Sequence, residues 1–383
     1  MALYLTVLIS MLNQIGLKGS RMLIALLALE FEADPVTIGF LISTYAVFPL
    51  MMAVYAGRLT DRIGVRWPML CGSLGMTAGL LIPCAWPALE ALFLSAMVLG
   101  AGNIFFHVSC HNLVGAIESK GGRTGNFGTF SLGASVSGML GPVLVGFMVD
   151  GAGYTWTFVT LAGIVIVPVF VLLLYPRFIP RVVQSKPDPQ AGGLRELLAD
   201  RALRNTLVTS GLIITAIDLF NFYMPIYGRA VGLSASTIGW VIGMQAAAAF
   251  VVRLWMPRLA RHFGEARVLT WSLLMAGATY LLFPMFDQPL VMGAVSFLLG
   301  LGLGCGQPLS IVLTYNNAPP ARIGEALGIR LAVNKFTQIS VPIVFGTLGA
   351  SFGVAPVFWS NAVLLMVGGA LTARARAVPG NRH

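Results

Sequence analysis

The sequence predicts an all-α, polytopic membrane protein with twelve transmembrane helices in two pseudo-symmetric six-helix bundles. Three observations lead to this fold class. Of the 383 residues, 57% are hydrophobic and only 10% are charged, a usage far from that of soluble domains. Apolar runs of roughly 20 residues, the length that crosses a bilayer, recur along the chain. The two halves also match each other at a fixed spacing.

Short stretches that hold nearly all of the charge separate the apolar segments. The predicted spans are 3–29, 36–55, 68–88, 91–116, 126–149, 156–175, 205–228, 236–256, 268–286, 290–315, 325–349 and 355–373. Residues 1–175 then form an N-terminal six-helix bundle and residues 205–383 a C-terminal one. Residues 176–204, which are basic and bear Pro and Gly, form a cytoplasmic linker.

The positions of the basic residues give the expected orientation. With a cytoplasmic N-terminus, nearly all Lys and Arg lie in cytoplasmic connections, as the positive-inside rule requires. The opposite side carries Arg229 and six acids, which are Glu30, Glu32, Asp34, Glu90, Asp150 and Asp287. We therefore expect a multi-pass protein of the inner membrane, surrounded by lipid, with both termini cytoplasmic. The net charge of +10 follows topology and does not indicate a nucleic-acid partner.

An internal repeat runs through most of each half at an offset of 200 residues. Residues 37–39 (Thr-Ile-Gly) recur at 237–239, and Leu99-Gly100 recurs at Leu299-Gly300. Further identities link 58–59 with 258–259, Gly64 with Gly264, Pro142 with Pro342, Gly146 with Gly346 and Phe158 with Phe358. Such repeats are common in transporter folds.

Residues 57–67 read GRLTDRIGVRW and form the connection expected between the second and third spans. This segment resembles the signature loop of the major facilitator superfamily of membrane transporters, and a degenerate copy, PRLARHFGEAR, occupies 257–267. The matching positions are Gly57, Asp61, Arg62, Gly64 and Arg66. The glycines permit a tight turn. The resemblance implies that Asp61 meets the positive end of the eleventh helix and gates the path together with Arg62. The alternative is a turn whose arginines only set the topology.

The fifth span resembles the helix-5 motif of proton-coupled exporters. The matching positions are Gly128, Gly141, Pro142 and Gly146, whereas Ser137 and Val145 replace two of the motif's glycines. An equally simple interpretation is a bent packing helix that importers also contain. The fourth span reads SAMVLGAGN over 95–103 and lacks the mid-helix arginine that many relatives carry.

Polar and ionisable residues inside the spans are the candidate site residues, because burying them in lipid is costly. The substrate-binding candidates are Gln14, Lys18, Arg21, Asn103, His107, Asp218, Asn221, Gln307, Arg330 and Lys335. Asp218, His107 and His111 are candidate proton carriers, since imidazole titrates near neutral pH. Asp218 as a static ion-pair partner, and the histidines as packing groups, are the alternatives. Two histidines without nearby acids or thiols do not predict a metal site.

The charges of these candidates favour an anionic substrate. Four cations, Lys18, Arg21, Arg330 and Lys335, stand against the single acid Asp218. Arginine binds carboxylate and phosphate oxygens through paired hydrogen bonds. Arg21 and Arg330 could instead extend to the membrane surfaces. Lys18 and Lys335 lie too deep in their predicted spans to do so.

The leading hypothesis is therefore a monomeric, proton-coupled secondary transporter of a small organic or inorganic anion, working by alternating access. The direction stays open, and export is the one that the helix-5 resemblance implies. A proton-driven multidrug efflux pump is the alternative within transport. A non-transporting membrane receptor is the alternative outside it. The sequence has no nucleotide-binding loop and no nucleophile with its base, so neither an enzyme nor a cofactor is expected.

Overall fold

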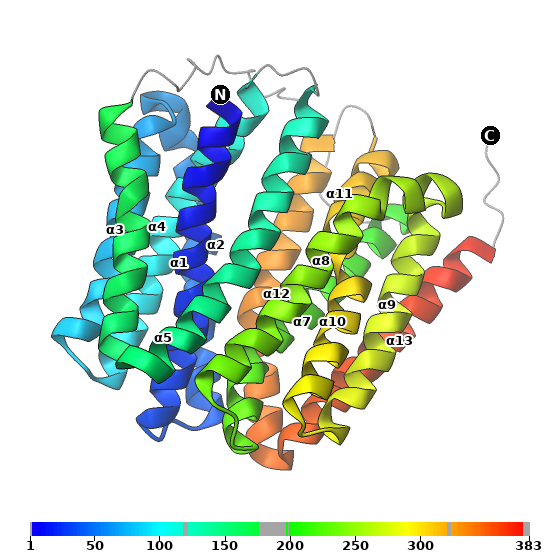
Figure 1. The fold of residues 1–383 in the computed structure, drawn as a ribbon. Helices are drawn as coiled ribbons and strands as arrows, with labels where there is room; N and C mark the ends of the chain where they lie inside the picture. Colours follow the sequence, from blue (N-terminus) through cyan, green and yellow to red (C-terminus); the bar gives the residue numbers. More distant parts are fainter. Residues whose placement is uncertain (1, 118–121, 176–196, 198, 320–322, 378–383) are drawn as a thin grey trace. The chain divides into compact units, whose positions relative to one another are not determined.

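The computed structural model describes residues 2–117, 122–175, 197, 199–319 and 323–377. The described residues form helices joined by short connections. These are α1 (Ala2–Glu30), α2 (Pro35–Ile63), α3 (Arg66–Ala85), α4 (Leu89–Ala116), α5 (Gly122–Leu174), α7 (Arg201–Ala230), α8 (Ala235–Phe263), α9 (Glu265–Leu282), α10 (Pro289–Gly304), α11 (Gly306–Asn317), α12 (Ile323–Phe352) and α13 (Val354–Ala377), with a 3₁₀ turn Phe283–Met285 after α9 (Figure 1).

A helical segment accounts for each of the twelve predicted spans. Helix α5 carries two of them, because Gly153 has a non-helical backbone with φ of 81° and bends the chain between them. Helices α10 and α11 together make one span. In the described ranges, nine segments are long and apolar enough to cross a membrane. Helices α1 and α12 are not among the nine, and they are the helices that carry the predicted pairs of cations.

The signature segment is mostly helix, so the expectation of a loop over 57–67 was wrong. Helix α2 continues to Ile63 and α3 begins at Arg66, which leaves Gly64 and Val65 as the connection. Gly64 has φ of 81°, a conformation that favours glycine. Hydropathy marks only the apolar part of a helix, whereas a charged helix end continues into water.

The linker expected over 176–204 lies mostly outside the described residues. Its last part is helical, because α7 begins at Arg201. Asp200 caps this start, since its Oδ1 accepts a hydrogen bond from the Leu203 N–H at 2.7 Å.

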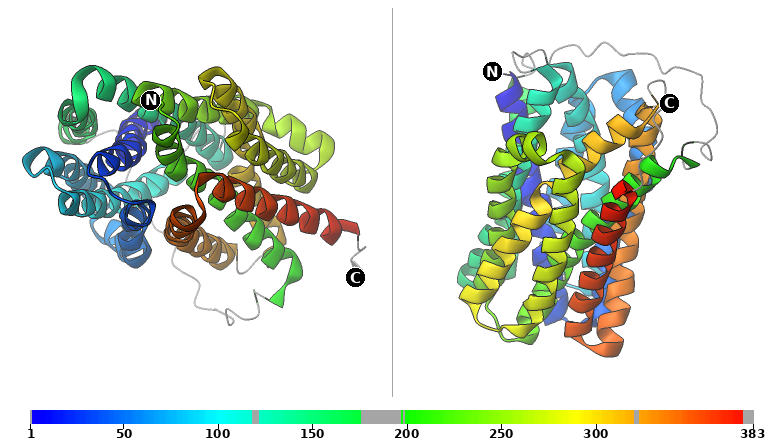
Figure 2. Two further views of the ribbon diagram at one scale, coloured as in Figure 1. Left: turned by 90° about the horizontal axis from the view of Figure 1, so that it is seen from below. Right: turned by 90° about the vertical axis from the view of Figure 1, so that its right-hand side faces the viewer.

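Packing divides the chain into two units. Unit 1 contains Met1–Lys186 and Asn221–Gly243, and unit 2 contains Pro187–Phe220 and Met244–His383. In unit 1, α5 packs against α1 and α3, and α4 packs against α2 and α3. In unit 2, α9 packs against α10 and α13, and α12 packs against α11 and α13. The helices within each unit run alongside one another (Figures 1 and 2).

The backbone confirms the repeat of 200 residues. Positive φ angles in the first half, at Glu32, Gly64 and Gly153, recur in the second half at Gly232, Gly264 and Gly353. Helix starts recur in the same way, as with Pro35 and Ala235 or Leu89 and Pro289. Equivalent positions in the two halves can therefore be compared residue by residue.

Candidate functional site

Arg330 lies at the centre of a buried polar network in unit 2. It extends from α12 and is 3% exposed. Its Nε and Nη2 donate to Ser310 Oγ at 3.2 and 2.7 Å, and Nη2 also donates to Gln307 Oε1 at 2.8 Å. Ser310 Oγ lies 2.8 Å from the Gln307 carbonyl, to which it donates. Two predicted residues, Gln307 and Arg330, are thus in direct contact, and Arg330 does not extend to a membrane surface.

Side chains of α7 and α12 extend this network. Ser210 of α7 donates to Asn334 Oδ1 of α12 at 3.0 Å and lies 3.5 Å from Ser310 Oγ. These partners are neutral, and within the described ranges no acid pairs with Arg330. Gln307 Nε2 is buried without a hydrogen-bond partner in the part of the chain that the structure describes. A buried cation among neutral partners, beside this amide donor, suits an anionic oxygen.

Helix α4 presents a pair of neighbouring imidazoles in unit 1, tilted by 40° relative to each other. The ring centroids of His107 and His111 are 4.2 Å apart. Phe130 lies edge-on to both rings, at 6.3 and 5.0 Å, and Phe127 lies 5.8 Å from His111. Asn103, one turn earlier, is half-buried.

The predicted cations of α1 lie among α2 and α5. The guanidinium carbon of Arg21 is 5.4 Å from the ring centroid of Tyr45, a cation–π contact. Lys18 is half-buried, and its Cβ lies where Gly141 of α5 approaches α1. Gln14 is half-buried one turn away.

Lys335 of α12 lies close to a neighbour on its own helix. Its Nζ donates to Gln338 Oε1 at 2.9 Å, and the side chain is half-buried. The structure therefore places it in a more open position than Arg330, which is on the same helix.

Asp218 of α7 is 7% exposed and lies near polar groups that the sequence did not single out. Tyr280 of α9 donates its hydroxyl to the carbonyl of Ala216 and lies within electrostatic range of Asp218. Asn361 of α13 adjoins Tyr280, and its amide makes no well-formed hydrogen bond to the described residues. The acid thus belongs to a buried polar cluster of α7, α9 and α13. Asn221, one turn later on α7, is half-buried and falls in unit 1.

The helix-5 motif residues let the backbone of α5 approach the backbones of α1 and α8 closely. A Cβ at Gly141 would meet the carbonyl of Ile15 and the amide nitrogen of Gly19 on α1. A Cβ at Gly146 would meet the carbonyl of Ala235 on α8. Pro142 lies inside the helix, and its carbonyl faces Gly239 of α8, whereas Gly128 has open space. Tight packing, one of the two interpretations of this motif, is therefore what these contacts provide.

Arg66 of the signature segment holds the end of α5. Its Nε donates to the Leu172 carbonyl at 3.0 Å and its Nη2 to the Leu173 carbonyl at 3.4 Å. These carbonyls belong to the last turn of α5, which has no further helical donors and carries partial negative charge. Arg62 is exposed, and the Asp61 side chain lies outside the described residues. Gating by this segment stays a prediction.

At the end of unit 1 opposite the signature segment, which we call the acidic end, charged groups join α1, α5, α7 and α8. Arg229 Nη2 lies 3.3 Å from Glu30 Oε1 and 3.1 Å from the Tyr154 hydroxyl, which itself donates to Glu30 at 2.9 Å. The Asp150 carboxylate accepts from the amides of Ala235 and Ser236 at 3.2 and 2.7 Å, which caps the start of α8.

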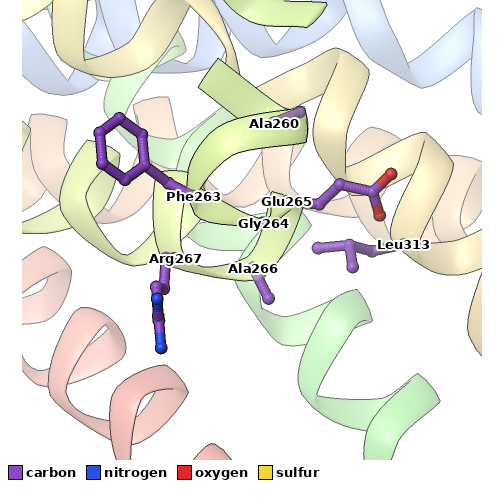
Figure 3. Close-up of a pocket in the computed structure, with 7 residues that line it drawn as sticks. All are labelled: Ala260, Phe263, Gly264, Glu265, Ala266, Arg267 and Leu313. Atoms are coloured by element: carbon purple, nitrogen blue, oxygen red, sulfur yellow. The ribbon is translucent and has the colours of Figure 1, made fainter. Parts of the chain in front are cut away.

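A hollow of about 520 Å³ lies at the turn between α8 and α9. It is lined by Ala260, Phe263, Gly264, Glu265, Ala266, Arg267 and Leu313 (Figure 3). Glu265 Oε2 accepts from Asn316 Nδ2 at 3.2 Å. None of the predicted substrate-binding residues lines it, so the hollow is separate from the Arg330 network.

The residues that the sequence analysis missed were the small polar partners. Ser310 follows Gln307 by three positions and Asn334 follows Arg330 by four, which places each pair on one helix face. Ser210 also matches Ser10 across the repeat. The spacing of three or four residues from each predicted residue is the signal that identifies these partners. Ser and Asn carry no charge, so the cost of burying a charge does not mark them.

Comparisons with known proteins agree with this architecture. The family model described as Major Facilitator Superfamily matches residues 6–234 and 206–382. The multidrug resistance protein MdtG of Serratia proteamaculans (strain 568) is 26% identical over 337 residues, covering 86% of this chain and 81% of that protein. A peptide transporter POT solved in complex with sulfate has a TM-score of 0.83 at 15% identity, covering 98% of this chain and 94% of that one. The nucleoside transporter NupG has a TM-score of 0.74 at 15% identity, with coverage of 97% and 99%.

Proposed function

Because the chain belongs to the major facilitator superfamily, we propose that it is a secondary active transporter that moves a small organic or inorganic anion across the inner membrane by alternating access. Export is the proposed direction, supported by the relatives of about one-quarter identity that are named multidrug resistance proteins. The protein works as a monomer with both termini in the cytoplasm, which puts the acidic end of unit 1 outside.

The Arg330 network is the observation that carries the anionic substrate. Removing a guanidinium from water is costly unless its charge is compensated. Here the partners are neutral oxygens of Ser310 and Gln307, and among the described residues the Gln307 Nε2 amide remains as a donor for a ligand. An anion would supply both the missing charge and the missing acceptors. Lys335 is a second cation on α12, and Lys18 and Arg21 of α1 stay predicted anion-binding residues of unit 1.

Proton coupling is assigned to titratable groups in each half. The His107–His111 pair supplies two imidazole rings that lie beside aromatic side chains, and imidazole titrates near neutral pH. Asp218 is the acid among the predicted site residues, and it lies buried beside Tyr280 in unit 2. Buried carboxyl groups are a common means of carrying protons in membrane transporters.

Ligand-dependent thermal stability tests the anionic substrate. The purified protein is heated with a panel of carboxylates, phosphates, phosphonates and lipophilic cations. Stabilisation by particular anions is expected, with an apparent dissociation constant about tenfold or more higher in Arg330→Gln, the loss of one charged hydrogen-bonding group. Lys18→Ala and Lys335→Ala should weaken binding less. Arg66→Gln, which removes an arginine outside the network, is the matched control and should bind normally.

A multidrug efflux pump for cationic or neutral compounds is the second candidate, favoured by the names of the MdtG relatives. The same panel separates the two. Stabilisation by lipophilic cations alone, unchanged in Arg330→Gln, would replace the anion hypothesis with this one.

A further inference from the structure

The span formed by α10 and α11 is kinked at the place where the Arg330 network begins. Helix α10 ends at Gly304, α11 begins at Gly306, and Pro308 follows two residues later. Proline has no N–H, so it cannot donate to the carbonyl four positions earlier, which here is Gly304. In a span surrounded by lipid, an unpaired carbonyl costs free energy and needs another donor.

Arg253 of α8 supplies that donor. Its Nε donates to the Gly304 carbonyl at 2.9 Å. Close packing makes this reach possible, since a Cβ at Gly300 would meet the Gln245 carbonyl and a Cβ at Gly304 would meet Ala249 and Val252. The two glycines, four residues apart, let α8 approach α10 along one face.

We propose that Arg253 substitutes for the backbone N–H that Pro308 lacks, and so holds the kink that positions Gln307 and Ser310 around Arg330. Both of those residues lie at the start of α11, directly after the kink. Arg253 acts on the ligand site indirectly, through the start of α11, so it is a positioning residue. The positioning part rests on the anion site proposed above, whereas the hydrogen-bond substitution does not.

The first half provides a natural comparison. Its equivalent residues are Ala53, Ile104 and Val108, in place of Arg253, Gly304 and Pro308. Helix α4 is continuous over Leu89–Ala116 through this region. The arginine, the close-packing glycine and the proline therefore occur together where the helix is interrupted, and all three are replaced where it is continuous. If Arg253 only set the membrane topology, it would not need to occur together with Gly304 and Pro308.

A double-mutant cycle in stability tests the substitution of one donor for another. Arg253→Met removes the donor and keeps most of the length, whereas Pro308→Ala restores a backbone N–H to the Gly304 carbonyl. Arg253→Met is expected to lower the thermal midpoint by several degrees when Pro308 is intact, and by much less when it is combined with Pro308→Ala. Arg253→Lys, which keeps a donor, should lie between.

The matched control for this cycle is Arg258→Met. Arg258 is an exposed arginine on the same helix that contacts Trp255, and its replacement should have the same effect with and without Pro308→Ala. Equal losses for Arg253→Met with and without Pro308→Ala would overturn the proposal.

Transport kinetics in proteoliposomes test the positioning. With an anion found by the stability panel, Arg253→Met is expected to raise KM about fivefold or more with little change in kcat, and Arg253→Lys to recover part of the loss. A lowered kcat at unchanged KM would contradict positioning of the binding groups. If no anion binds at all, the proposed substrate fails, while the stability cycle still reports on the hydrogen bond.

Discussion

The two halves of the molecule share a backbone and differ in chemistry at equivalent positions. Across the offset of 200 residues, Phe130 stands where Arg330 is, and His107 stands where Gln307 is. The first half thus presents imidazoles among aromatic rings, and the second presents a guanidinium held by neutral oxygens. On the function proposed above, one scaffold carries an imidazole pair in one half, and an anion-binding cluster together with the acid Asp218 in the other.

This difference separates residues that specify the fold from residues that specify the function. Positive-φ positions and close helix crossings recur in both halves, because each bundle needs the same backbone geometry. Apart from Ser210, which matches Ser10, the buried polar side chains of the Arg330 network do not recur. Function in such a fold is therefore read from the positions at which the repeat is broken.

The largest expected effect comes from residues that both halves share. A Cβ at Gly100 would meet the carbonyl of Tyr45, and a Cβ at Gly300 would meet the carbonyl of the equivalent residue, Gln245. Gly100→Ala and Gly300→Ala should each cost about 3 kcal/mol, because the backbones of the crossing helices must move apart. Thermal midpoints and the folded fraction on size-exclusion chromatography measure this.

Gly57→Ala is the control for the glycine prediction. Gly57 lies inside α2, and a Cβ there would have nothing within 4 Å. The substitution should leave stability unchanged or raise it by about 0.5 kcal/mol, since alanine favours helix more than glycine does. If Gly100→Ala or Gly300→Ala proved as harmless as this control, the shared crossing would not be part of the common scaffold.

The next prediction changes a residue of the first half into its equivalent in the second. His107→Gln should reduce flux driven by a pH gradient about tenfold or more, because the pair loses a titrating ring, and should preserve exchange without a gradient. Fluorescent pH indicators in proteoliposomes measure the coupled flux. Cys110→Ser, which also copies the second half at a buried position of α4, is the control and should retain coupling. Normal gradient dependence in His107→Gln would remove the imidazole pair from the coupling hypothesis.

Most of the fold could be predicted from the sequence, because membrane spans, charge asymmetry and the repeat are strong signals. The predicted span over 91–116, for example, differs from α4 by two residues at its start. The helical continuation of α2 through Arg62 was missed, since hydropathy does not report a solvated helix end. Arg330 and Gln307 were identified through the cost of burying them, and the structure brings them together. The role of Arg253 could not be foreseen, because it depends on a carbonyl that only the packing of α8 against α10 places within reach.

The smallest expected effect again compares equivalent positions, at the starts of α2 and α8. Asp34 Oδ1 accepts from the Thr37 amide at 3.1 Å, and Ser234 Oγ accepts from the equivalent Thr237 amide at 3.2 Å. Hydrogen bonds from Thr37, first from its side chain and then from its amide, hold the pKa of Asp34 below its usual value of 3.8. A lowered pKa means that the cap stabilises above that value and is lost as the pH falls through the folded-state pKa.

Asp34→Ala should therefore cost about 1 kcal/mol at neutral pH, and this difference from wild type should shrink below about pH 4. Ser234→Ala should cost a similar amount with no such decline, since a hydroxyl does not titrate in this range. Hydrogen exchange at the Thr37 and Thr237 amides measures both caps in one sample. Parallel pH dependence at the two amides would contradict this prediction, because it would show that the charge of the Asp34 carboxylate adds nothing to what a hydroxyl provides. The two caps would then be equivalent parts of the scaffold that both halves share.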